Sequence, residues 1–332
     1  MNLDSLSAFL DKNKHPSFRN SQIVKNYFSA RYNSFEEMTD LPQTLRQQLS
    51  QNFDLYSVKE KNLISSPQTQ KALLQLSDNK FIETVLMDYG DWLTACVSSQ
   101  VGCPLGCTFC ATGQMSFSRN LTPAEIVDQI IYWNRKLYPK YIGRVVFMGM
   151  GEPFLNWDNL LTAIDMINSK AGLNIGARKI SISTAGITDK IKQFADLNTQ
   201  INLAVSLHSA HQQNRQTIMP IAFKYPLDEL KAVCHYFTQK TNRQIFFEYA
   251  LINKFNDTAQ DIDYLLQFFD NNHLFYLNLI PLNPVTGGLD PSPKQAIKKF
   301  TQLLDKTNIK YSLRRTFGQN INAACGQLAL KT

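Results

Sequence analysis

Three closely spaced cysteines are the residues in this chain best suited to chemistry. Cys103, Cys107 and Cys110 stand in the run Gly-Cys-Pro-Leu-Gly-Cys-Thr-Phe-Cys, a Cys-x3-Cys-x2-Cys spacing. Three thiolates at this spacing suit three irons of a 4Fe–4S cube, which proteins normally hold with four cysteines. Because no fourth cysteine lies nearby, one iron is left open to a ligand that is not protein. An open position on a bound metal is typical of a catalytic site.

Other uses of these thiols fit the sequence less well. A structural zinc site takes four ligands, usually from two separated pairs, and no second Cys-x2-Cys is present. Disulfides between neighbouring cysteines are rare in the reducing cytosol. Electron transfer alone normally uses a fourth cysteine to close the cube. The motif therefore favours an open cluster, with zinc as the alternative.

The remaining cysteines differ in their surroundings. Cys234 shares the apolar stripe of a predicted helix with Leu230 and Phe237, which predicts a core position. Cys96 ends a predicted strand seven residues before Cys103, and Cys325 lies in Ala-Ala-Cys-Gly-Gln-Leu towards the carboxyl terminus. Two such thiols near a redox centre are suited to a transient disulfide.

Polar and glycine-rich motifs follow several apolar runs. In Met148-Gly149-Met150-Gly151-Glu152-Pro153, the glycines allow a ligand to approach the backbone, and Glu152 is suited to accept a hydrogen bond from an ammonium group. Comparable motifs contain Ser183, Ser206-Leu207-His208 and Asn283, and Phe109 in the cysteine loop is suited to pack against an adenine ring. Each motif alone is consistent with a turn or a cap. Together, beside an open iron, they predict a binding site.

A further candidate is Glu83, which shares one face of the predicted strand Phe81–Met87 with Val85. A carboxylate among apolar neighbours is suited to act as a general base. The pattern alone favours the other interpretation, a glutamate on an edge strand that faces water.

The elements that must position these residues alternate in type. Predicted strands are Ala72–Ser77, Phe81–Met87, Trp92–Val97, Arg144–Met148, Lys179–Thr184, Ile201–Leu207, Gln244–Ile252, Phe275–Pro281 and Lys310–Arg314. Predicted helices are Trp157–Lys170, Asp189–Leu197, Leu227–Lys240, Thr258–Asn271 and Pro293–Thr307, and a further helix starts at the capping box Thr122–Glu125. Apolar strands joined by helices predict an α/β fold in which a parallel sheet curves towards a barrel, with the site at the carboxyl ends of the strands.

The first fifty or so residues predict short helices over Asp4–Leu10, Ser21–Tyr32 and Leu41–Leu49. Basic and aromatic residues are interleaved here: Lys12, Lys14, Phe18, Arg19, Lys25, Tyr27, Phe28, Arg31, Tyr32 and Arg46. One interpretation is a small module that contacts RNA phosphates. The other is solvated charge around an ordinary helical core.

The overall composition narrows the class of protein. The 332 residues carry a formal net charge of +7, which fits a polyanionic partner but is weak evidence alone. We expect a cytoplasmic protein without membrane contact, because the sequence has neither a signal peptide nor the run of about twenty apolar residues that spans a bilayer.

Together these motifs resemble the RlmN/Cfr family of radical S-adenosylmethionine RNA adenosine methyltransferases. The likeness extends from about Ser21 to Leu328, and includes Cys-Val-Ser-Ser-Gln-Val-Gly-Cys, the cysteine loop, Met-Gly-Met-Gly-Glu-Pro, Ser-Leu-His and Ala-Ala-Cys-Gly-Gln-Leu. It implies a partial (β/α)6 barrel with a small helical amino-terminal domain that binds RNA. We expect boundaries at 1–70 for that domain, 71–98 for a β-hairpin extension and 99–332 for the barrel with its catalytic carboxyl-terminal segment.

The resemblance also implies residue roles. Cys103, Cys107 and Cys110 would hold the 4Fe–4S cluster, and two molecules of S-adenosylmethionine would be used per turnover. Its contacts would include Gly151, Glu152, Ser183, Ser206, Leu207, His208 and Asn283. Cys325 would carry the methyl group, Glu83 would be the general base and Cys96 the resolving thiol.

The implied substrate is an adenosine of 23S rRNA, with tRNA beside the anticodon as a second substrate. A flavodoxin-like protein or a thiol system would supply electrons to a monomeric enzyme. Gly151-Glu152-Pro153 favours methylation at carbon 2, whereas Phe317 is more typical of the Cfr branch, which methylates carbon 8 and confers resistance to ribosome-targeting antibiotics. A hypothesis from another class is a non-catalytic RNA-binding protein with a structural metal.

Overall fold

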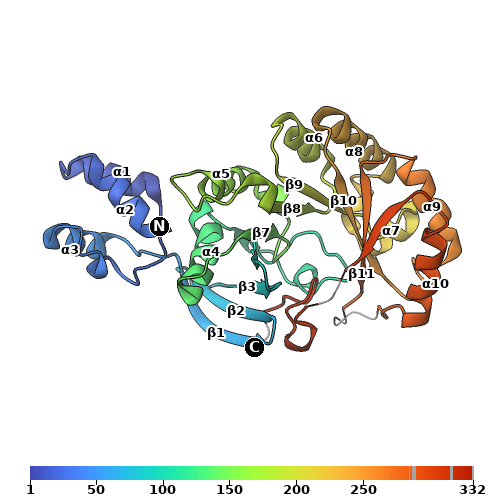
Figure 1. Cartoon of the computed structure of the whole chain (residues 1–332), viewed down its shortest axis with the longest axis horizontal. Coiled ribbons are helices and arrows are strands. Elements are labelled where there is room, and N and C mark those ends of the chain that lie inside the picture. Colours follow the sequence, from blue (N-terminus) through green and yellow to red (C-terminus); the bar gives the residue numbers. More distant parts are fainter. Residues whose placement is uncertain (284, 286–288, 315–316, 331–332) are drawn as a thin grey trace.

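A strongly curved β-sheet forms the centre of the structure (Figure 1). The computed structural model describes residues 1–283, 285, 289–314 and 317–330. Within these residues one ten-stranded sheet has the order β1-β2-β3-β4-β7-β8-β9-β10-β11-β12, and β5 (Gln100–Val101) pairs with β6 (Arg119–Asn120). Because β1 and β12 lie at opposite ends of this order, the sheet does not close on itself.

The second part of the sheet is parallel. It contains β4 (Leu93–Cys96), β7 (Arg144–Phe147), β8 (Ile180–Thr184), β9 (Asn202–Ser206), β10 (Ile245–Leu251), β11 (Phe275–Pro281) and β12 (Lys310–Leu313). The helices between them are α4 (Pro123–Leu137), α5 (Trp157–Asn168), α6 (Thr188–Asp196), α7 (Gln212–Ile218), α8 (Leu227–Thr241), α9 (Ala259–Phe269) and α10 (Lys294–Leu304). Short 3₁₀ turns are Phe35–Glu37, Thr112–Gln114, Pro153–Asn156, Ala177–Lys179, Pro220–Phe223 and Gln319–Ile321. The predicted partial (β/α)6 barrel is confirmed.

An antiparallel extension precedes the barrel. It consists of β1 (Val58–Ser66), β2 (Thr69–Leu76) and β3 (Phe81–Asp88), and β3 pairs with β4. β1 was not predicted from the sequence, and it falls inside the range 1–70 expected to be helical. Four polar residues in succession, 59–62, hide the alternation that identifies a strand. The domain boundaries themselves remain a prediction.

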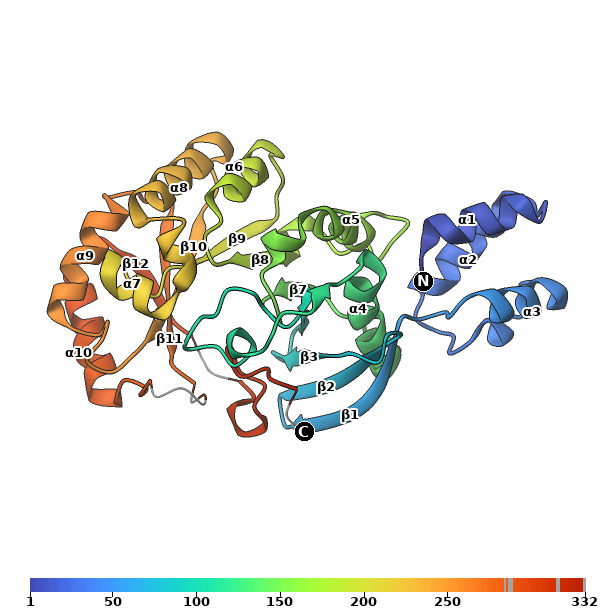
Figure 2. The same ribbon diagram turned by 180° about the vertical axis from the view of Figure 1, so that it is seen from behind.

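Three helices, α1 (Leu3–Lys12), α2 (Phe18–Phe28) and α3 (Gln43–Asn52), lie at one end of the molecule, away from the barrel (Figures 1 and 2). They attach to α4 through Asp128, whose carboxylate accepts hydrogen bonds from the Tyr27 hydroxyl and from the N–H and hydroxyl of Ser57. Burial, followed by the charge of Asp128, raises the pKa of Tyr27. Tyr27 and Phe28 are therefore core residues and not a surface for stacking RNA bases.

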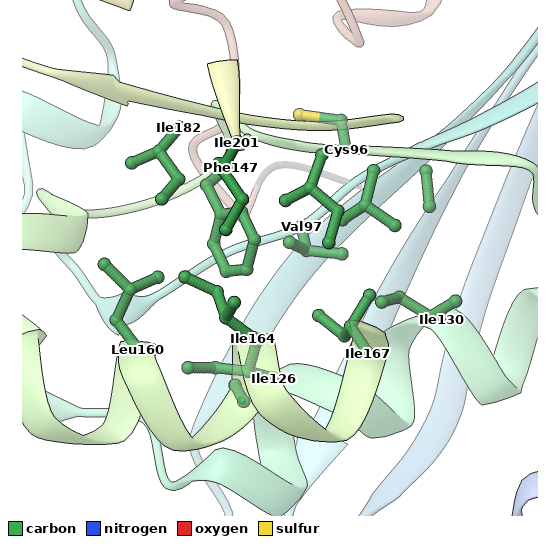
Figure 3. Packing of buried hydrophobic residues seen from close by; sticks show 14 of the residues in the cluster. Cys96, Val97, Ile126, Ile130, Phe147, Leu160, Ile164, Ile167, Ile182 and Ile201 are labelled. Carbon is green, nitrogen blue, oxygen red and sulfur yellow. The ribbon is translucent and has the colours of Figure 1, made fainter. Parts of the chain in front are cut away.

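Alternation along the strands separates the core from the barrel interior. In β8, Ile180 and Ile182 are buried, whereas Ser181 and Ser183 are partly exposed. Figure 3 shows part of the core, in which Phe147 and Ile182 from the sheet pack close to Ile164 of α5. The interior of the barrel is therefore free to hold polar groups. No helix in the described part of the chain is long and apolar enough to cross a membrane.

Candidate active site

A cavity of about 170 Å³ lies at the carboxyl ends of the barrel strands, and we call it the barrel cavity. It brings together most of the residues expected to form the site. Those that line it are Cys103, Cys107, Phe109, Cys110, Gly151, Glu152, Ser183, Ser206, His208, Asn283 and Cys325. Segments separated by more than two hundred residues thus contribute to one site, as predicted for the carboxyl edge of a parallel sheet.

The cysteine loop rests on an apolar surface. Cys107 is buried, and the loop packs on Ile218, Met219 and Leu282. The N–H of Thr108 donates to the carbonyl of Ile218 at 3.0 Å, which fixes the loop to the end of α7. Burial raises the pKa of Cys103 to about 12 and also raises the pKa values of the other two thiols. Three ionised thiolates here need a positive partner.

The donor set fits an iron–sulfur cube. In such a cube each thiolate binds a different iron, so the three sulfurs surround the cluster and do not converge on one point. Consistent with that requirement, no three His, Cys, Asp or Glu side chains among the described residues converge closely enough to hold a single metal ion. The irons would supply positive charge directly at the three sulfurs, in addition to the more distant Arg215 and Arg314.

The glycine-rich run after β7 packs against the chain that follows β4. A Cβ on Gly149 would lie 2.7 Å from the backbone of Val97, and one on Gly151, where φ is +98°, would lie 2.5 Å from the Gln100 side chain. The sequence analysis attributed these glycines to close approach of a ligand. Both line the barrel cavity, but the contacts that exclude a Cβ are contacts with protein.

Glu152 is held rigidly at the edge of the cavity. Its two carboxylate oxygens accept hydrogen bonds from the backbone N–H groups of Ala185, at 2.7 Å, and Phe154, at 3.0 Å. The side chain is almost fully buried, and this burial raises its pKa to about 7 despite those hydrogen bonds. Within the described part of the chain Glu152 forms no ion pair, and a buried carboxylate of this kind is suited to receive an ammonium group.

His208 is fixed as a neutral residue. Its backbone has a φ of +53°, and its Nδ1 accepts a hydrogen bond from the N–H of Ala250 at 3.0 Å. Burial lowers its pKa to about 3. Its ring centroid lies 4.4 Å from that of Phe109, so the two rings form one wall of the cavity. Phe109 thus packs on His208 within the protein.

Arg215 is a positioning residue that the sequence analysis missed. It is completely buried, and its guanidinium donates to the carbonyls of Ala185, Ser206 and Leu207, at 2.7, 3.1 and 3.2 Å. It therefore holds the carboxyl ends of β8 and β9 together. Burial lowers its pKa to about 10. A lone arginine in a polar helical sequence gives no signal that it will be buried.

The segment that carries Cys325 is tied to the cysteine loop. The N–H of Ala111 donates to the Gly326 carbonyl at 2.7 Å, and the Thr112 hydroxyl donates to the Leu328 carbonyl at 2.6 Å. The Asn283 amide donates to the carbonyl of Cys325 itself at 3.0 Å. The amide oxygen of Asn283 is buried without a partner in the described structure, and it is therefore available to a ligand.

A second cavity, the Cys96 cavity, adjoins the first. Cys96 and Cys325 both line it, together with Val85, Met148 and Arg314. Cys325 is exposed and lines both cavities, whereas Cys96 is buried at the end of β4. Burial raises the pKa of Cys96 to about 12, while the nearby Arg314 guanidinium favours the thiolate. Cys325 therefore faces both cavities, whereas Cys96 faces only the Cys96 cavity.

Glu83 is buried, so the interpretation of a water-facing edge glutamate is wrong. β3 lies between β2 and β4, and Glu83 forms an ion pair with Lys71 at 2.7 Å. Its other oxygen accepts a hydrogen bond from the N–H of Ala329 at 2.9 Å. Val85, on the same face of β3, lines the Cys96 cavity, but Glu83 lines neither cavity. The carboxyl-terminal segment lies over it.

Leu207 also lies outside the site. Its side chain is fully buried in the main core, and it does not line the barrel cavity. Its carbonyl is taken by Arg215. A direct contact between its side chain and a cofactor is not supported by this arrangement.

Two family models match the chain. Residues 97–269 match the radical SAM superfamily, and residues 1–55 match the ribosomal RNA large subunit methyltransferase N-terminal domain.

Curated relatives match almost the whole chain. A protein of Clostridium tetani is 40% identical over 99% of this chain and 94% of its own length, and one of Clostridium novyi is 38% identical over 98% and 95%. Both are described as probable dual-specificity RNA methyltransferase RlmN. Among solved structures, a radical SAM methyltransferase from Sphaerobacter thermophilus matches with a TM-score of 0.95 and 35% identity, covering 100% of this chain and 98% of that one.

Proposed function

Because this chain belongs to the radical SAM superfamily, and within it to the RlmN group of RNA methyltransferases, we propose that it methylates carbon 2 of an adenosine in 23S rRNA. The adenosine beside the anticodon of tRNA is its second substrate. The observation that carries the proposal is the position of Cys325, which lines both the barrel cavity and the Cys96 cavity. A methyl carrier needs access to the donor on one side and to the acceptor on the other.

Radical SAM enzymes use S-adenosylmethionine and a 4Fe–4S cluster. Cys103, Cys107 and Cys110 would hold the cluster, and Glu152 and Asn283 would receive polar groups of S-adenosylmethionine. When bound, the cluster supplies the electron for reductive cleavage of S-adenosylmethionine, which activates an unreactive C–H bond. Such activation is needed because carbon 2 of adenine is electron-poor and has no lone pair for ordinary methyl transfer.

The reaction begins on the protein. The Cys325 thiolate attacks the methyl group of one S-adenosylmethionine by displacement, forming a carbon–sulfur bond and releasing S-adenosylhomocysteine. The methyl group on Cys325 would then lose a hydrogen atom to the radical chemistry that the cluster and a second S-adenosylmethionine supply. The carbon on Cys325 then adds to carbon 2 of adenine, so that protein and RNA are covalently joined.

Release of the product needs a base and a second thiol. Glu83 removes the proton from carbon 2, and Cys96 attacks the sulfur of Cys325 to form a disulfide, while the departing methylene carbon takes up a proton to complete the methyl group. The one electron left over from the radical adduct would return to the oxidised cluster. In this structure one Glu83 oxygen accepts a hydrogen bond from the Ala329 N–H and the other pairs with Lys71. The carboxyl-terminal segment therefore has to move before Glu83 can reach the base. Cys96 needs no such movement to reach the cavity that it shares with Cys325.

The disulfide requires an external reductant, and the cleavage requires an electron donor. We propose a flavodoxin-like protein or a thiol system for these roles, and a monomeric enzyme in the cytoplasm, where its RNA substrates are made.

The test is anaerobic reconstitution with iron, sulfide and a reductant, followed by incubation with 23S rRNA and tRNA. Mass spectrometry of the nucleosides should find 2-methyladenosine. Finding 8-methyladenosine instead would assign the carbon 8 reaction, a second candidate because Phe317 resembles the Cfr branch and lines the Cys96 cavity. Neither product from either RNA, in the presence of an intact cluster, would refute the proposal.

A further inference from the structure

The opposite end of the barrel, at the amino termini of the parallel strands, carries a group of cations. Arg144 opens β7, and Arg178 and Lys179 immediately precede β8. All three side chains are exposed and line a cavity of about 240 Å³ together with Tyr89 and Trp92. We call these five residues the basic mouth. No carboxylate lines this cavity among the described residues.

Aromatic rings lead from the basic mouth towards the cysteines. The Arg144 guanidinium lies 4.1 Å from the Trp92 ring centroid, and Trp92 stacks on Tyr89 with centroids 5.6 Å apart. Tyr89 in turn contacts Phe317 at 4.9 Å, and Phe317 lines the Cys96 cavity. Rings of this kind, next to cations, are typical of surfaces that bind single-stranded nucleic acid.

Inside the basic mouth, the barrel holds hydrogen-bonding groups. A further cavity of about 310 Å³, the inner basin, is lined by Ser181, Asn202 and Asn278 and by the apolar Phe246 and Val146. Ser181 and Asn202 also line the cavity of the basic mouth, so the two cavities adjoin. Hydroxyl and amide groups between apolar side chains are suited to an extruded base.

Arg314 connects this route to the chemistry. It lines the cavity of the basic mouth, the inner basin, the Cys96 cavity and the barrel cavity. Its guanidinium is fixed by Glu248, the single carboxylate among the described residues that line the inner basin, at 3.2 Å. Glu248 thus pairs with Arg314 inside the barrel, whereas Arg144, Arg178 and Lys179 have no carboxylate beside them among the described residues of their cavity.

We propose that the RNA enters the barrel from the amino-terminal ends of its strands. Arg144, Arg178 and Lys179 bind the phosphates that flank the target nucleotide, and the target base passes into the inner basin towards Cys325. The base and the cysteine loop thus approach Cys325 from opposite ends of the barrel. This inference rests on the proposed function and adds the substrate's binding surface to it.

Charge reversal tests the proposal. The triple variant Arg144→Glu, Arg178→Glu, Lys179→Glu is compared with the control Lys240→Glu, Lys298→Glu, Lys299→Glu, which makes the same charge change at exposed positions on α8 and α10. The probe is an in vitro transcript of the 23S rRNA region around the peptidyl-transferase centre. We expect the mouth variant to bind it about a hundredfold more weakly and to lower the salt slope by about 2 to 3 units.

S-methylation of Cys325, which needs no RNA, should be unchanged in the mouth variant when measured by protein mass. The milder variant Arg144→Gln, Arg178→Gln, Lys179→Gln should show a smaller loss of RNA affinity. It controls for misfolding of the charge-reversed protein. Equal RNA affinity and salt slope in the mouth and control variants would overturn the inference.

Crosslinking provides an independent test of where the RNA enters. A photoreactive benzoylphenylalanine in place of Phe246, in the inner basin, should crosslink to the RNA, whereas one in place of the exposed Leu266 on α9 should not. RNA attached at Leu266 and absent at Phe246 would exclude entry through the inner basin. A wild-type enzyme that binds through the basic mouth yet forms no methyladenosine would refute the proposed function and leave this surface standing.

Discussion

The ammonium group of Lys71 lies 2.7 Å from a carboxylate oxygen of Glu83, and both side chains are almost completely excluded from water. The two residues lie on neighbouring antiparallel strands, where Leu73 pairs with Glu83 and Lys71 with Val85. They are therefore diagonal neighbours on the face that borders the Cys96 cavity. The ion pair gives the Glu83 carboxylate a fixed position, as the proposed role of general base requires.

Replacing Lys71 with Met should destabilise the protein by about 3 kcal/mol, because it leaves a buried carboxylate without its cation. Chemical denaturation measures the change. Lys59→Met is the matched control, since its pair with Asp54 is 3.9 Å long and exposed, and its loss should cost about 0.5 kcal/mol or less. The double variant Lys71→Met, Glu83→Gln should recover part of the loss. Equal effects of the two lysine variants would contradict a structural role for the buried pair.

Replacing Cys96 with Ala should trap the enzyme on its RNA. Without the resolving thiol, the covalent link between Cys325 and adenine persists, and a protein–RNA adduct should accumulate on denaturing gels. Cys234→Ala is the control, because that thiol is buried in the outer core, as predicted from its helical stripe. The Cys234→Ala variant should turn over normally and lose about 1 kcal/mol of stability. Multiple turnovers by the Cys96 variant would show that another group releases the product.

Glu152 should make the unliganded protein less stable as pH rises. Its pKa is about 7 in the folded state, through burial, against an ordinary value of 4.5. The unfolded chain therefore releases this proton first, and the penalty grows between pH 4.5 and 7 to about 3 kcal/mol. His208 acts in the opposite direction below its ordinary pKa of 6.5, because its folded pKa is about 3.

The difference between wild type and Glu152→Gln isolates the glutamate, since the glutamine oxygen still accepts a hydrogen bond and the histidine is common to both. Denaturation at pH 5 and pH 8 should show the variant gaining stability over wild type at the higher pH. A difference that does not change with pH would rule out a raised pKa for Glu152.

Replacing Arg215 with Met should cost about 3 kcal/mol, because three buried carbonyls lose their donor. Arg215→Lys should restore part of the stability through one remaining donor group. The affinity of the reconstituted protein for S-adenosylmethionine, measured by calorimetry, should be lower in the Met variant. The reason is that the ends of β8 and β9 line the barrel cavity, where we propose that S-adenosylmethionine binds. Unchanged stability and unchanged binding would show that the strand ends hold their positions without it.

Much of the barrel follows from the sequence because its signals are local. β11 was predicted over the residues that it occupies, and α4 begins at its capping box, where Thr122 and Glu125 bond as expected. The strand ends marked by Ser183, Ser206 and Asn283 converge on one cavity because parallel strands share an edge. The family resemblance added the roles of Cys96 and Cys325, which spacing alone leaves undefined.

What the sequence could not provide depends on distant contacts. Glu83 has the same local pattern whether β3 is an edge strand or a central one, and only the pairing of β2 and β4 on its two sides buries it. Arg215 is recognisable as a clamp only when the carbonyls it binds have been brought together by folding. The basic mouth likewise combines Trp92, Arg144 and Arg178, which no sequence motif unites.

The hydrogen bonds from Ala111 and Thr112 to the segment around Cys325 have a consequence for damage by oxygen. Oxidation that removes iron from the cysteine loop should also weaken these hydrogen bonds, which fix the segment around Cys325. Loss of the cluster should therefore affect more than the radical step. It should also impair the proposed transfer of a methyl group to Cys325, because this residue would no longer be held beside the methyl donor. An oxidised enzyme should therefore methylate Cys325 poorly and leave the RNA unmodified.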